Sequence, residues 1–224
     1  MERTDESITW HTGALPQETL HALEFFAKQE WLKNSSWYLA GGTALALQGG
    51  HRVSVDLDFF LPKKDFAVNE VLKYMPEPDW QTDSAAEGTI YGTYRGAKMS
   101  FIAYPFFVPK EPPLKYGTIS VLAARDIAVM KIVAISQRGR KRDFIDLYWY
   151  CLNYETLIEV LRRLPGQYPT VAHDYHHILK AMLYFADAED DPMPELFFKA
   201  NWEEVKAYFR RELPPIAETL LELK

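Results

Sequence analysis

The chain has 224 residues, of which 48% are hydrophobic and 25% are charged, and its formal net charge is −6. This is the composition of a globular protein with a sizeable core, and the acidic balance argues against a surface that grips nucleic acid all over. The single cysteine, Cys151, excludes an intrachain disulfide and a cysteine-based zinc cluster.

The sequence carries no membrane or export signal. Its apolar runs are shorter than a membrane-spanning helix requires, because charged residues interrupt even the longest of them. The N-terminus is acidic and lacks the basic and then apolar pattern of a signal peptide. We therefore expect a cytoplasmic protein with no membrane partner.

The first residues mix helical and strand patterns. Apolar residues recur at helical spacing over 16–32, and the short run WYLA stops at a glycine pair before the helix formers TALALQ. In RVSVDLDFFL, residues 52–61, apolar and polar residues alternate strictly, which is typical of a half-buried strand. The alternation places Val53, Val55, Leu57 and Phe59 on one face and Ser54, Asp56 and Asp58 on the other.

The remaining elements divide into two parts. A helix is predicted over 64–75, ending before the proline-rich PEPDW, and 88–106 predicts a β-hairpin with RGAK at its turn. Prolines then mark a break at 108–118. Beyond it, helices are predicted over 120–138, 142–153, 155–164, 174–188 and 201–224. We expect an α+β protein with an α/β domain at 1–118 and a helical domain at 119–224.

Two features of residues 38–61 suggest a binding or catalytic site. Gly41 and Gly42, between a strand and a helix, leave backbone N–H groups and a positive dipole end accessible, which suits a phosphate; a tight turn also explains them. On a strand, Asp56 and Asp58 point to one face about 6–7 Å apart. Both can bind one hard cation such as Mg²⁺ or Mn²⁺, although a basic partner or exposure at the strand end would also compensate their charge.

The stretch GGTALALQGGHRVSVDLDFF resembles the signature of the nucleotidyltransferase superfamily, and more narrowly that of the AbiEii/AbiGii toxin family of type IV, abortive-infection toxin–antitoxin pairs. The helix with Lys131, the following KRDFIDLY and the later LYFADAEDDPMP resemble the same family. The resemblance covers about residues 37–200. It implies a nucleotidyltransferase-like mixed sheet with helices, followed by a helical domain, and a cognate antitoxin as a partner.

The resemblance also implies roles for single residues. It implies that Gly41, Gly42 and Thr43 contact the phosphates of a nucleoside triphosphate (NTP), that Asp56 and Asp58 ligate Mg²⁺, and that Lys131 reaches the triphosphate. A surface lysine lying along apolar neighbours is the alternative for Lys131.

The later acidic residues match the family's late acidic motif. One of Asp143 and Asp146 is expected to act as general base or to position the acceptor hydroxyl, and Asp143 is the preferred candidate. Pairing of these aspartates with Arg140 or Arg142 is the alternative. Arg52 is expected either to touch phosphate or to support the strand.

The expected activity is Mg²⁺-dependent transfer of a nucleoside monophosphate from an NTP to an RNA end, such as that of a tRNA, or to a protein hydroxyl. The basic run RGRKR, residues 138–142, is expected to contact phosphates of the acceptor or to be a solvated loop. Many nucleotidyltransferases carry a third carboxylate on a later strand, where this chain has Ser100. Either the late aspartates supply its function, or the protein is a weak enzyme or a catalytically silent binding module. A kinase-like phosphotransferase with the same pocket is a further alternative.

Overall fold

The computed structural model describes residues 8–221, and within that range seven strands form one mixed sheet in the order β3-β4-β5-β2-β1-β7-β6. The strands are β1 (Tyr38–Ala40), β2 (Leu57–Leu61), β3 (Trp80–Ala86), β4 (Thr89–Tyr94), β5 (Ala97–Ala103), β6 (Leu114–Tyr116) and β7 (Ile119–Val121). β1 is antiparallel to β2 and parallel to β7, and β2 is parallel to β5. The acidic N-terminal stretch considered above includes residues 1–7, which lie outside the described residues. The predicted last helix includes residues 222–224, which also lie outside them.

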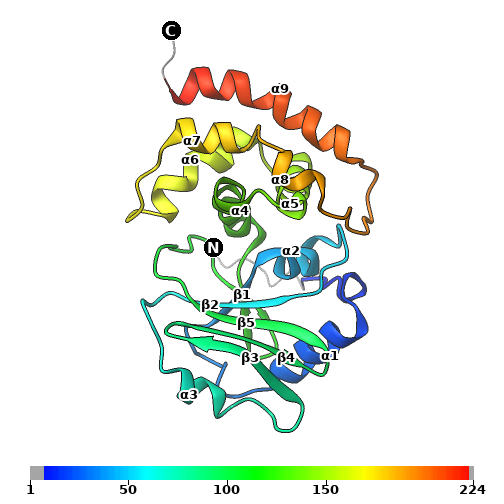
Figure 1. Cartoon of the computed structure of the whole chain (residues 1–224), viewed down its shortest axis with the longest axis vertical. Helices are drawn as coiled ribbons and strands as arrows, with labels where there is room; N and C mark the ends of the chain where they lie inside the picture. Colours follow the sequence, from blue (N-terminus) through cyan, green and yellow to red (C-terminus); the bar gives the residue numbers. More distant parts are fainter. Residues whose placement is uncertain (1–7, 222–224) are drawn as a thin grey trace, which may run out of the picture.

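The helices lie on both sides of this sheet and beyond it. They are the 3-10 helix η1 (Thr12–Ala14), then α1 (Gln17–Phe26), α2 (Gly41–Gly49), α3 (Val68–Leu72), α4 (Ala124–Arg138), α5 (Lys141–Asn153), α6 (Leu157–Gln167), α7 (Tyr175–Ala181), α8 (Ala186–Glu189) and α9 (Trp202–Leu220). In Figure 1, α1 and α3 lie below the sheet, whereas α2 lies above it and contacts α4 and α5 of the helical layer. The prediction of an α+β protein with a mixed sheet followed by a helical region is confirmed.

The alternation of β2 separates the core from the cavity described below. Leu57, Phe59 and Leu61 are buried on the α1 side, where Phe59 stacks on Phe101 of β5 with ring centroids 5.1 Å apart. Burial of such a side chain stabilises the fold by roughly 1.5–3 kcal/mol. Asp58 and the other intervening residue of β2 therefore face the opposite side, toward the helical layer.

Several predicted boundaries are wrong, and the physical reasons differ. The predicted strand at 52–61 begins only at Leu57, and Val55, expected in the core, is 47% exposed. Residues 51–53 instead pair with a segment far along the chain: Val53 N–H donates to Glu195 O at 2.9 Å, and Phe197 N–H donates to His51 O at 2.9 Å. Alternation alone does not reveal which partner a strand-like segment finds.

The other differences follow from short or polar elements. β3 was not predicted, because its sequence WQTDSAA is mostly polar and it forms an exposed edge. β7 occupies the start of the helix predicted at 120–138; it begins one residue past the expected boundary at 118 and extends the sheet. The helix predicted over 174–188 is two short helices, α7 and α8, and the one predicted over 16–32 ends at Phe26.

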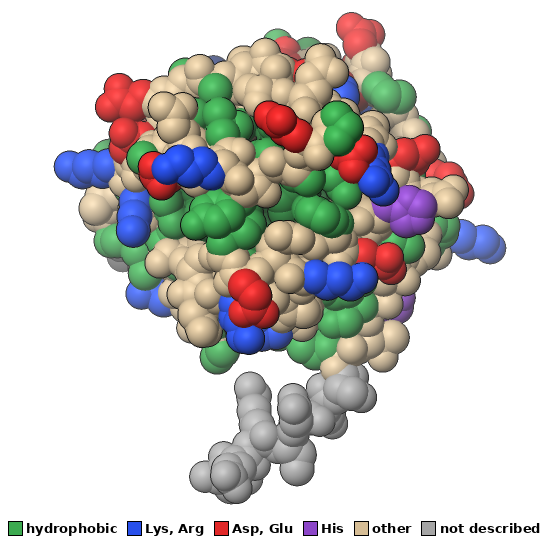
Figure 2. Space-filling model, turned by 90° about the horizontal axis from the view of Figure 1, so that it is seen from below, with side chains coloured by type: hydrophobic (Ala, Val, Ile, Leu, Met, Phe, Trp, Pro, Cys, Tyr) green, Lys and Arg blue, Asp and Glu red, His purple; other side chains and the backbone are tan. Residues whose placement is uncertain are grey.

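The described surface has two features that bear on partners. No helix within residues 8–221 is long and apolar enough to cross a membrane. On the face below the sheet, shown in Figure 2, acidic and basic side chains are interspersed with apolar ones, so no basic track gathers on that face.

Candidate active site

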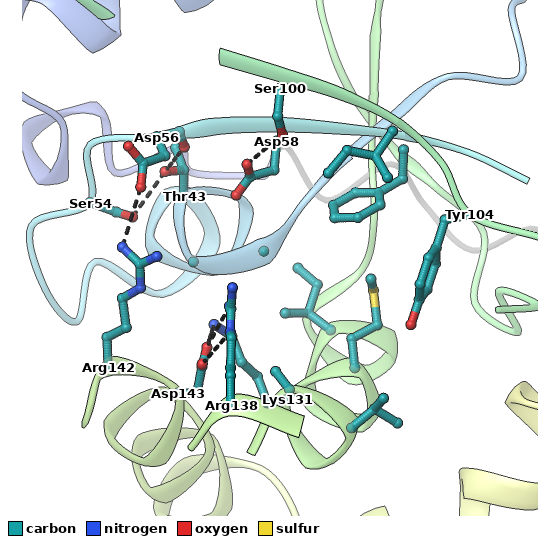
Figure 3. A pocket seen from close by; sticks show the side chains of 18 of the residues that line it. Thr43, Ser54, Asp56, Asp58, Ser100, Tyr104, Lys131, Arg138, Arg142 and Asp143 are labelled. Carbon is teal, nitrogen blue, oxygen red and sulfur yellow. Dashed lines mark hydrogen bonds and ion pairs between the residues drawn. The ribbon is translucent and has the colours of Figure 1, made fainter. Parts of the chain in front are cut away.

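A cavity of ≈ 470 Å³ lies between the sheet and helices α4 and α5 (Figure 3). Its polar end holds the glycine pair, the carboxylates of Asp56 and Asp58, and cationic side chains that reach in from α4 and α5. Its other end is apolar and is lined by Phe60, Ile102, Tyr104, Ile127, Met130, Val133 and Ala134. The two ends give the cavity the mixed character of a site for a small, charged ligand that also carries an apolar ring.

Local interactions place the two halves of the cavity together. Gln48 at the end of α2 accepts the Ala124 N–H at 2.8 Å and donates to Leu122 O at 2.9 Å, so it fixes the start of α4. Gly139 ends α4 in the left-handed conformation, with φ of +52°. Because α5 begins at Lys141, the turn brings the end of one helix and the start of the next to the same cavity.

The glycine pair lines the cavity, and side chains that pack against it leave little room for a Cβ atom at either position. Gly41 has φ of +74°, and a Cβ there would lie 3.1 Å from Asp58 Oδ2. A Cβ on Gly42 would lie 2.4 Å from the Arg52 guanidinium, which is too close. The glycines therefore allow a tight approach of strand, helix and arginine, which accounts for the turn, and the expected contact with a phosphate stays a prediction.

Thr43 lines the cavity, but its hydroxyl is used inside the protein. The Thr43 Oγ1 atom lies within hydrogen-bond distance of Ser54 Oγ, at 2.9 Å, and of the Asp56 carbonyl oxygen. These contacts tie α2 to the segment that leads into β2. The Thr43 side chain therefore positions Asp56, and only its backbone N–H remains as a contact for a phosphate.

Asp56 and Asp58 both line the cavity, as predicted. Asp58 pairs in register with Ser100 on β5, and the Ser100 hydroxyl donates to Asp58 Oδ1 at 2.6 Å. Burial raises the pKa of Asp58 above its ordinary value, the nearby charge of Asp56 raises it further, and the Ser100 hydrogen bond opposes the rise. Ser100 thus lies beside Asp58, on the strand where many nucleotidyltransferases carry a third carboxylate.

Asp143, Asp146 and Lys131 form a buried cluster with Arg52. The Lys131 Nζ atom lies 2.8 Å from Asp143 Oδ1 and 2.6 Å from Asp146 Oδ2. Arg52 donates to both Asp146 oxygens, from Nε at 2.6 Å and from Nη2 at 2.9 Å. His51 Nε2 lies 2.8 Å from Asp146 Oδ1. The same carboxylate is therefore shared by three basic side chains.

These contacts decide several alternatives. Lys131 is 4% exposed, so the surface-lysine alternative is wrong. Asp143 and Asp146 do not pair with Arg140 or Arg142, because Lys131 and other basic residues hold them. Asp146 is fully buried and does not line the cavity, in contrast to the other eight predicted site residues.

The pKa values of the two late aspartates respond to this cluster. Burial alone would raise the pKa of Asp143, but Lys131 and Arg138 outweigh it and hold the pKa below its ordinary value. For Asp146 burial is likewise outweighed, by Arg52 and Lys131, and the pKa lies well below the ordinary value. Both carboxylates therefore stay ionised at neutral pH.

The three arginines of the basic run 138–142 are about half exposed, and each makes an ion pair within the protein. Arg138 Nε donates to Asp143 Oδ2 at 3.1 Å, and Arg140 Nη2 lies 2.6 Å from Asp191 Oδ1. Arg142 Nη1 donates to Asp56 Oδ2 at 3.2 Å, which bridges α5 and the segment before β2 (Figure 3).

The contacts of Lys141 show what the later LYFADAEDDPMP segment does in the fold. Its backbone N–H donates to Asp191 Oδ2 at 3.0 Å, and its ammonium donates to the carbonyl oxygens of Glu189 and Asp191. These contacts anchor the first turn of α5, from which Arg142 and Asp143 reach the cavity. The segment therefore supports the site from outside it.

Sequence reasoning missed Ser54 and the apolar wall, and it expected Arg138 and Arg142 to contact an acceptor rather than to line this cavity. Ser54, Arg138 and Arg142 line the polar end, and the apolar wall comes from β2, β5 and α4. A usable signal was the position of Arg142, directly before the predicted Asp143 in the first turn of a helix. The apolar wall gave no signal, because its residues look like ordinary core.

The donor set at the polar end fits a hard divalent cation. Within residues 8–221, no group of three or more His, Cys, Asp or Glu side chains lies close enough to share a metal ion. Two carboxylates, one of them with a raised pKa beside the other, are a repulsive pair that such a cation relieves. Mg²⁺ is commonly held by one or two carboxylates, with water and phosphate oxygens completing its coordination.

Comparisons with known proteins agree with this geometry. The family model described as nucleotidyl transferase AbiEii toxin, type IV TA system, matches residues 30–88 and 94–222. An uncharacterized protein of Aquifex aeolicus (strain VF5), aq_aa25, is 34% identical over 191 residues, covering 82% of this chain and 89% of that protein.

Two solved structures share the fold. The nucleotidyltransferase toxin MenT4 from Mycobacterium tuberculosis has a TM-score of 0.56 at 16% identity, covering 93% of this chain and 87% of MenT4. JHP933 from Helicobacter pylori has a TM-score of 0.50 at 18% identity, covering 93% of this chain and 95% of JHP933. The prediction of a nucleotidyltransferase-like fold is confirmed. Since the family model also spans most of the chain, the protein belongs to the AbiEii family of nucleotidyltransferase toxins of type IV toxin–antitoxin systems.

Proposed function

We propose that this protein transfers a nucleoside monophosphate from an NTP to a hydroxyl group, with Mg²⁺ or Mn²⁺ held by Asp56 and Asp58. The observation that carries the proposal is the single cavity in which both carboxylates, the N-terminus of α2 and several cationic side chains meet. In the reaction, the acceptor oxygen bonds to the α-phosphorus, the bond from that phosphorus to the bridging oxygen of the β-phosphate breaks, and pyrophosphate leaves. The hydroxyl proton passes to solvent.

The metal fits the carboxylate pair and supplies one kind of chemistry. A bound divalent cation neutralises charge on the phosphate oxygens and makes the α-phosphorus a better electrophile. The chain itself orients Asp58 through the Ser100 hydroxyl and holds the Asp56 backbone through Thr43. The absence of side chains at Gly41 and Gly42 lets the triphosphate approach the first turn of α2.

The late aspartates have a positioning role in this proposal. Asp143 accepts from both Lys131 and Arg138, so it holds two cations at the cavity rather than acting as an unpaired base. Asp146 lies behind it and fixes Arg52 and Lys131. The cations are thereby kept where a triphosphate would need compensation of its charge.

The apolar end of the cavity suits the base of the nucleotide. Phe60 and Tyr104 contribute aromatic rings from the sheet, and Met130 and Ile127 form the opposite wall on α4. A nucleobase between such walls buries apolar area and leaves its triphosphate at the polar end, beside Asp56 and Asp58.

The acceptor is an RNA end, such as that of a tRNA, or a protein hydroxyl. The internal partners of Arg138 and Arg140 limit the use of the basic run as a phosphate track, so both acceptor classes belong in the assay. A cognate antitoxin is the partner that membership in a type IV toxin family suggests.

The test is a transfer assay with magnesium, each α-labelled NTP, and either bulk RNA or bulk protein. Label should enter an acceptor and pyrophosphate should be released. Asp56→Asn and Asp58→Asn should each abolish both, whereas Asp83→Asn, on the exposed edge strand β3, should leave them unchanged. Undiminished transfer by both cavity variants would refute the proposal, and release of a nucleoside diphosphate instead would indicate kinase-like chemistry.

Ser100 motivates a second candidate function, the catalytically silent module. A serine beside Asp58 supplies neither an anionic metal ligand nor a base. In that case metal and NTP should bind, as measured by calorimetry, but no acceptor should yield pyrophosphate. Turnover with any acceptor excludes this candidate.

A further inference from the structure

The cations that line the cavity differ in what holds them. Lys131 is buried between Asp143 and Asp146, and Arg52 is held by both oxygens of Asp146. Arg138 bonds both oxygens of Asp143, with distances of 3.1 Å and 3.4 Å. In each case the carboxylate partner lies outside the pair that fits a metal ion.

Arg142 is held differently. Within residues 8–221 its guanidinium makes a single hydrogen bond, at 3.2 Å from Nη1 to Asp56 Oδ2, and that carboxylate belongs to the pair that fits the metal. The Arg142 side chain is 47% exposed and the Asp56 side chain 30% exposed, so water reaches the contact. An exposed ion pair of this kind stabilises the fold little and is readily exchanged.

We propose that Arg142 is a triphosphate-binding residue that neutralises Asp56 until a divalent cation takes its place. The proposal rests on the function proposed above. A metal ion at Asp56 and Asp58 brings two positive charges next to the guanidinium, which repels Arg142 and removes its partner's negative charge. The released guanidinium then lies at the polar end of the cavity, where an incoming triphosphate offers oxygens that its planar fork can bind in pairs.

The exchange keeps each cation beside an anion. Before binding, the charge of Asp56 is opposed by Arg142, and Asp58 has the Ser100 hydroxyl as its hydrogen-bond partner. After binding, the two charges of the metal offset the two carboxylates, and Arg142 is free to offset part of the negative charge of the triphosphate.

The proposal predicts two effects of opposite sign for Arg142→Ala. Nucleotide-free protein should bind Mn²⁺ about threefold to tenfold more tightly, because a competing cation is gone. Affinity for α,β-methylene NTP analogues in saturating magnesium should fall about tenfold or more, because a charge-assisted contact is lost. Arg142→Lys should keep the competition with metal but recover only part of the nucleotide affinity, since an ammonium lacks the planar fork.

The experiment is calorimetry of the full-length protein, first with Mn²⁺ alone and then with each analogue. Arg140→Ala is the matched control: it removes one arginine from the same run, but Arg140 pairs with Asp191 and does not line the cavity. This control should change neither affinity. A purely structural role for Arg142 would instead weaken both affinities, and thermal unfolding of each variant identifies a loss of folding.

The outcomes separate this proposal from the function on which it rests. If Arg142→Ala leaves Mn²⁺ affinity equal to that of Arg140→Ala, or weakens it, the exchange is refuted. If it tightens Mn²⁺ binding but leaves nucleotide affinity unchanged, the triphosphate contact is refuted. If Asp56→Asn and Asp58→Asn still bind Mn²⁺ and nucleotide as the wild type does, the proposed function itself fails.

Discussion

Two pairs of aspartates flank the same cavity, and their surroundings are opposite. Asp56 and Asp58 have one exposed arginine and one serine hydroxyl as partners, and burial raises the pKa of Asp58. Asp143 and Asp146 are fully buried, yet basic neighbours lower both pKa values. The first pair has a deficit of positive charge and the second has none.

The difference teaches that residue type and spacing do not decide what an aspartate does. A carboxylate pair short of positive charge is available to a cation from solution, whereas a pair already saturated by Lys131 and Arg52 holds parts of the protein in place. Each pair can be tested separately by substitution. Changes at the first pair should mainly lower activity, whereas changes at the second pair should mainly lower stability.

The largest expected effect is on catalysis at the first pair. Asp56→Asn should lower nucleotide transfer by about 10³-fold or more, because the metal loses a ligand, while the free energy of unfolding should change by less than about 1 kcal/mol, since the side chain is partly exposed. Transfer rates and urea unfolding of the same preparation check both parts. A strongly unfolded variant would contradict the assignment of Asp56 as a functional residue.

At the second pair the main effect should be on stability. Asp146→Ala leaves Arg52 and Lys131 buried without their shared partner, which should cost about 3–5 kcal/mol in urea unfolding. Because the pKa of Asp146 is lowered, its stabilising contribution is complete above the ordinary pKa of 3.8 and is lost as the pH falls through the lower folded-state value. Wild type and variant should therefore differ fully at pH 7 and converge in strong acid; an equal stability at pH 7 would show that the cluster contributes nothing.

Asp58→Asn should stabilise the metal-free protein. The pKa of Asp58 is raised, so its ionised form lowers stability above the folded-state pKa, and that cost disappears below the ordinary value of 3.8. Removing the charge should raise the free energy of unfolding by on the order of 1 kcal/mol at pH 7 and give no gain in strong acid. Thermal unfolding in chelator across this pH range measures it, and a destabilised variant at pH 7 would reverse the sign argued here.

The smallest effect is expected at Ser100. Ser100→Ala removes the hydroxyl that stabilises ionised Asp58 and should weaken Mn²⁺ binding about twofold to tenfold. Thr93→Ala is the matched control, because Thr93 donates to an exposed aspartate on the same sheet, at Asp83. Equal Mn²⁺ affinity of Ser100→Ala and the control would remove Ser100 from the metal site.

Much of the fold could be predicted, because its long elements carry strong local patterns. The hairpin turning at RGAK is observed as β4 and β5, and α5 and α6 lie within a few residues of prediction. The misses are elements whose existence depends on distant partners. β7 is three residues long and forms because β1 lies beside it, and β3 forms on the edge of β4 despite its polar sequence.

For the site, sequence reasoning found residues that motifs carry and missed the pairings among them. The carboxylates and glycines followed from a local stretch, and the structure places them in one cavity. Nothing in the sequence shows that Asp146 would turn away to hold Arg52, or that Arg142 would reach Asp56, because these partners are 94 and 86 residues apart. Charge pairing over such distances is set by the packing of α5 on α2 and α4.

The pairing of residues 51–53 with 195–197 has a consequence for how the protein is made. During synthesis Asp56 and Asp58 emerge before α4 and α5, and the segment 195–197 that pairs with residues 51–53 emerges after both helices. A chain that stops before α5 lacks Arg142 and Asp143 of the cavity lining. One that stops between α5 and residue 195 has the lining but leaves residues 51–53, which lead toward Asp56, without their backbone partners.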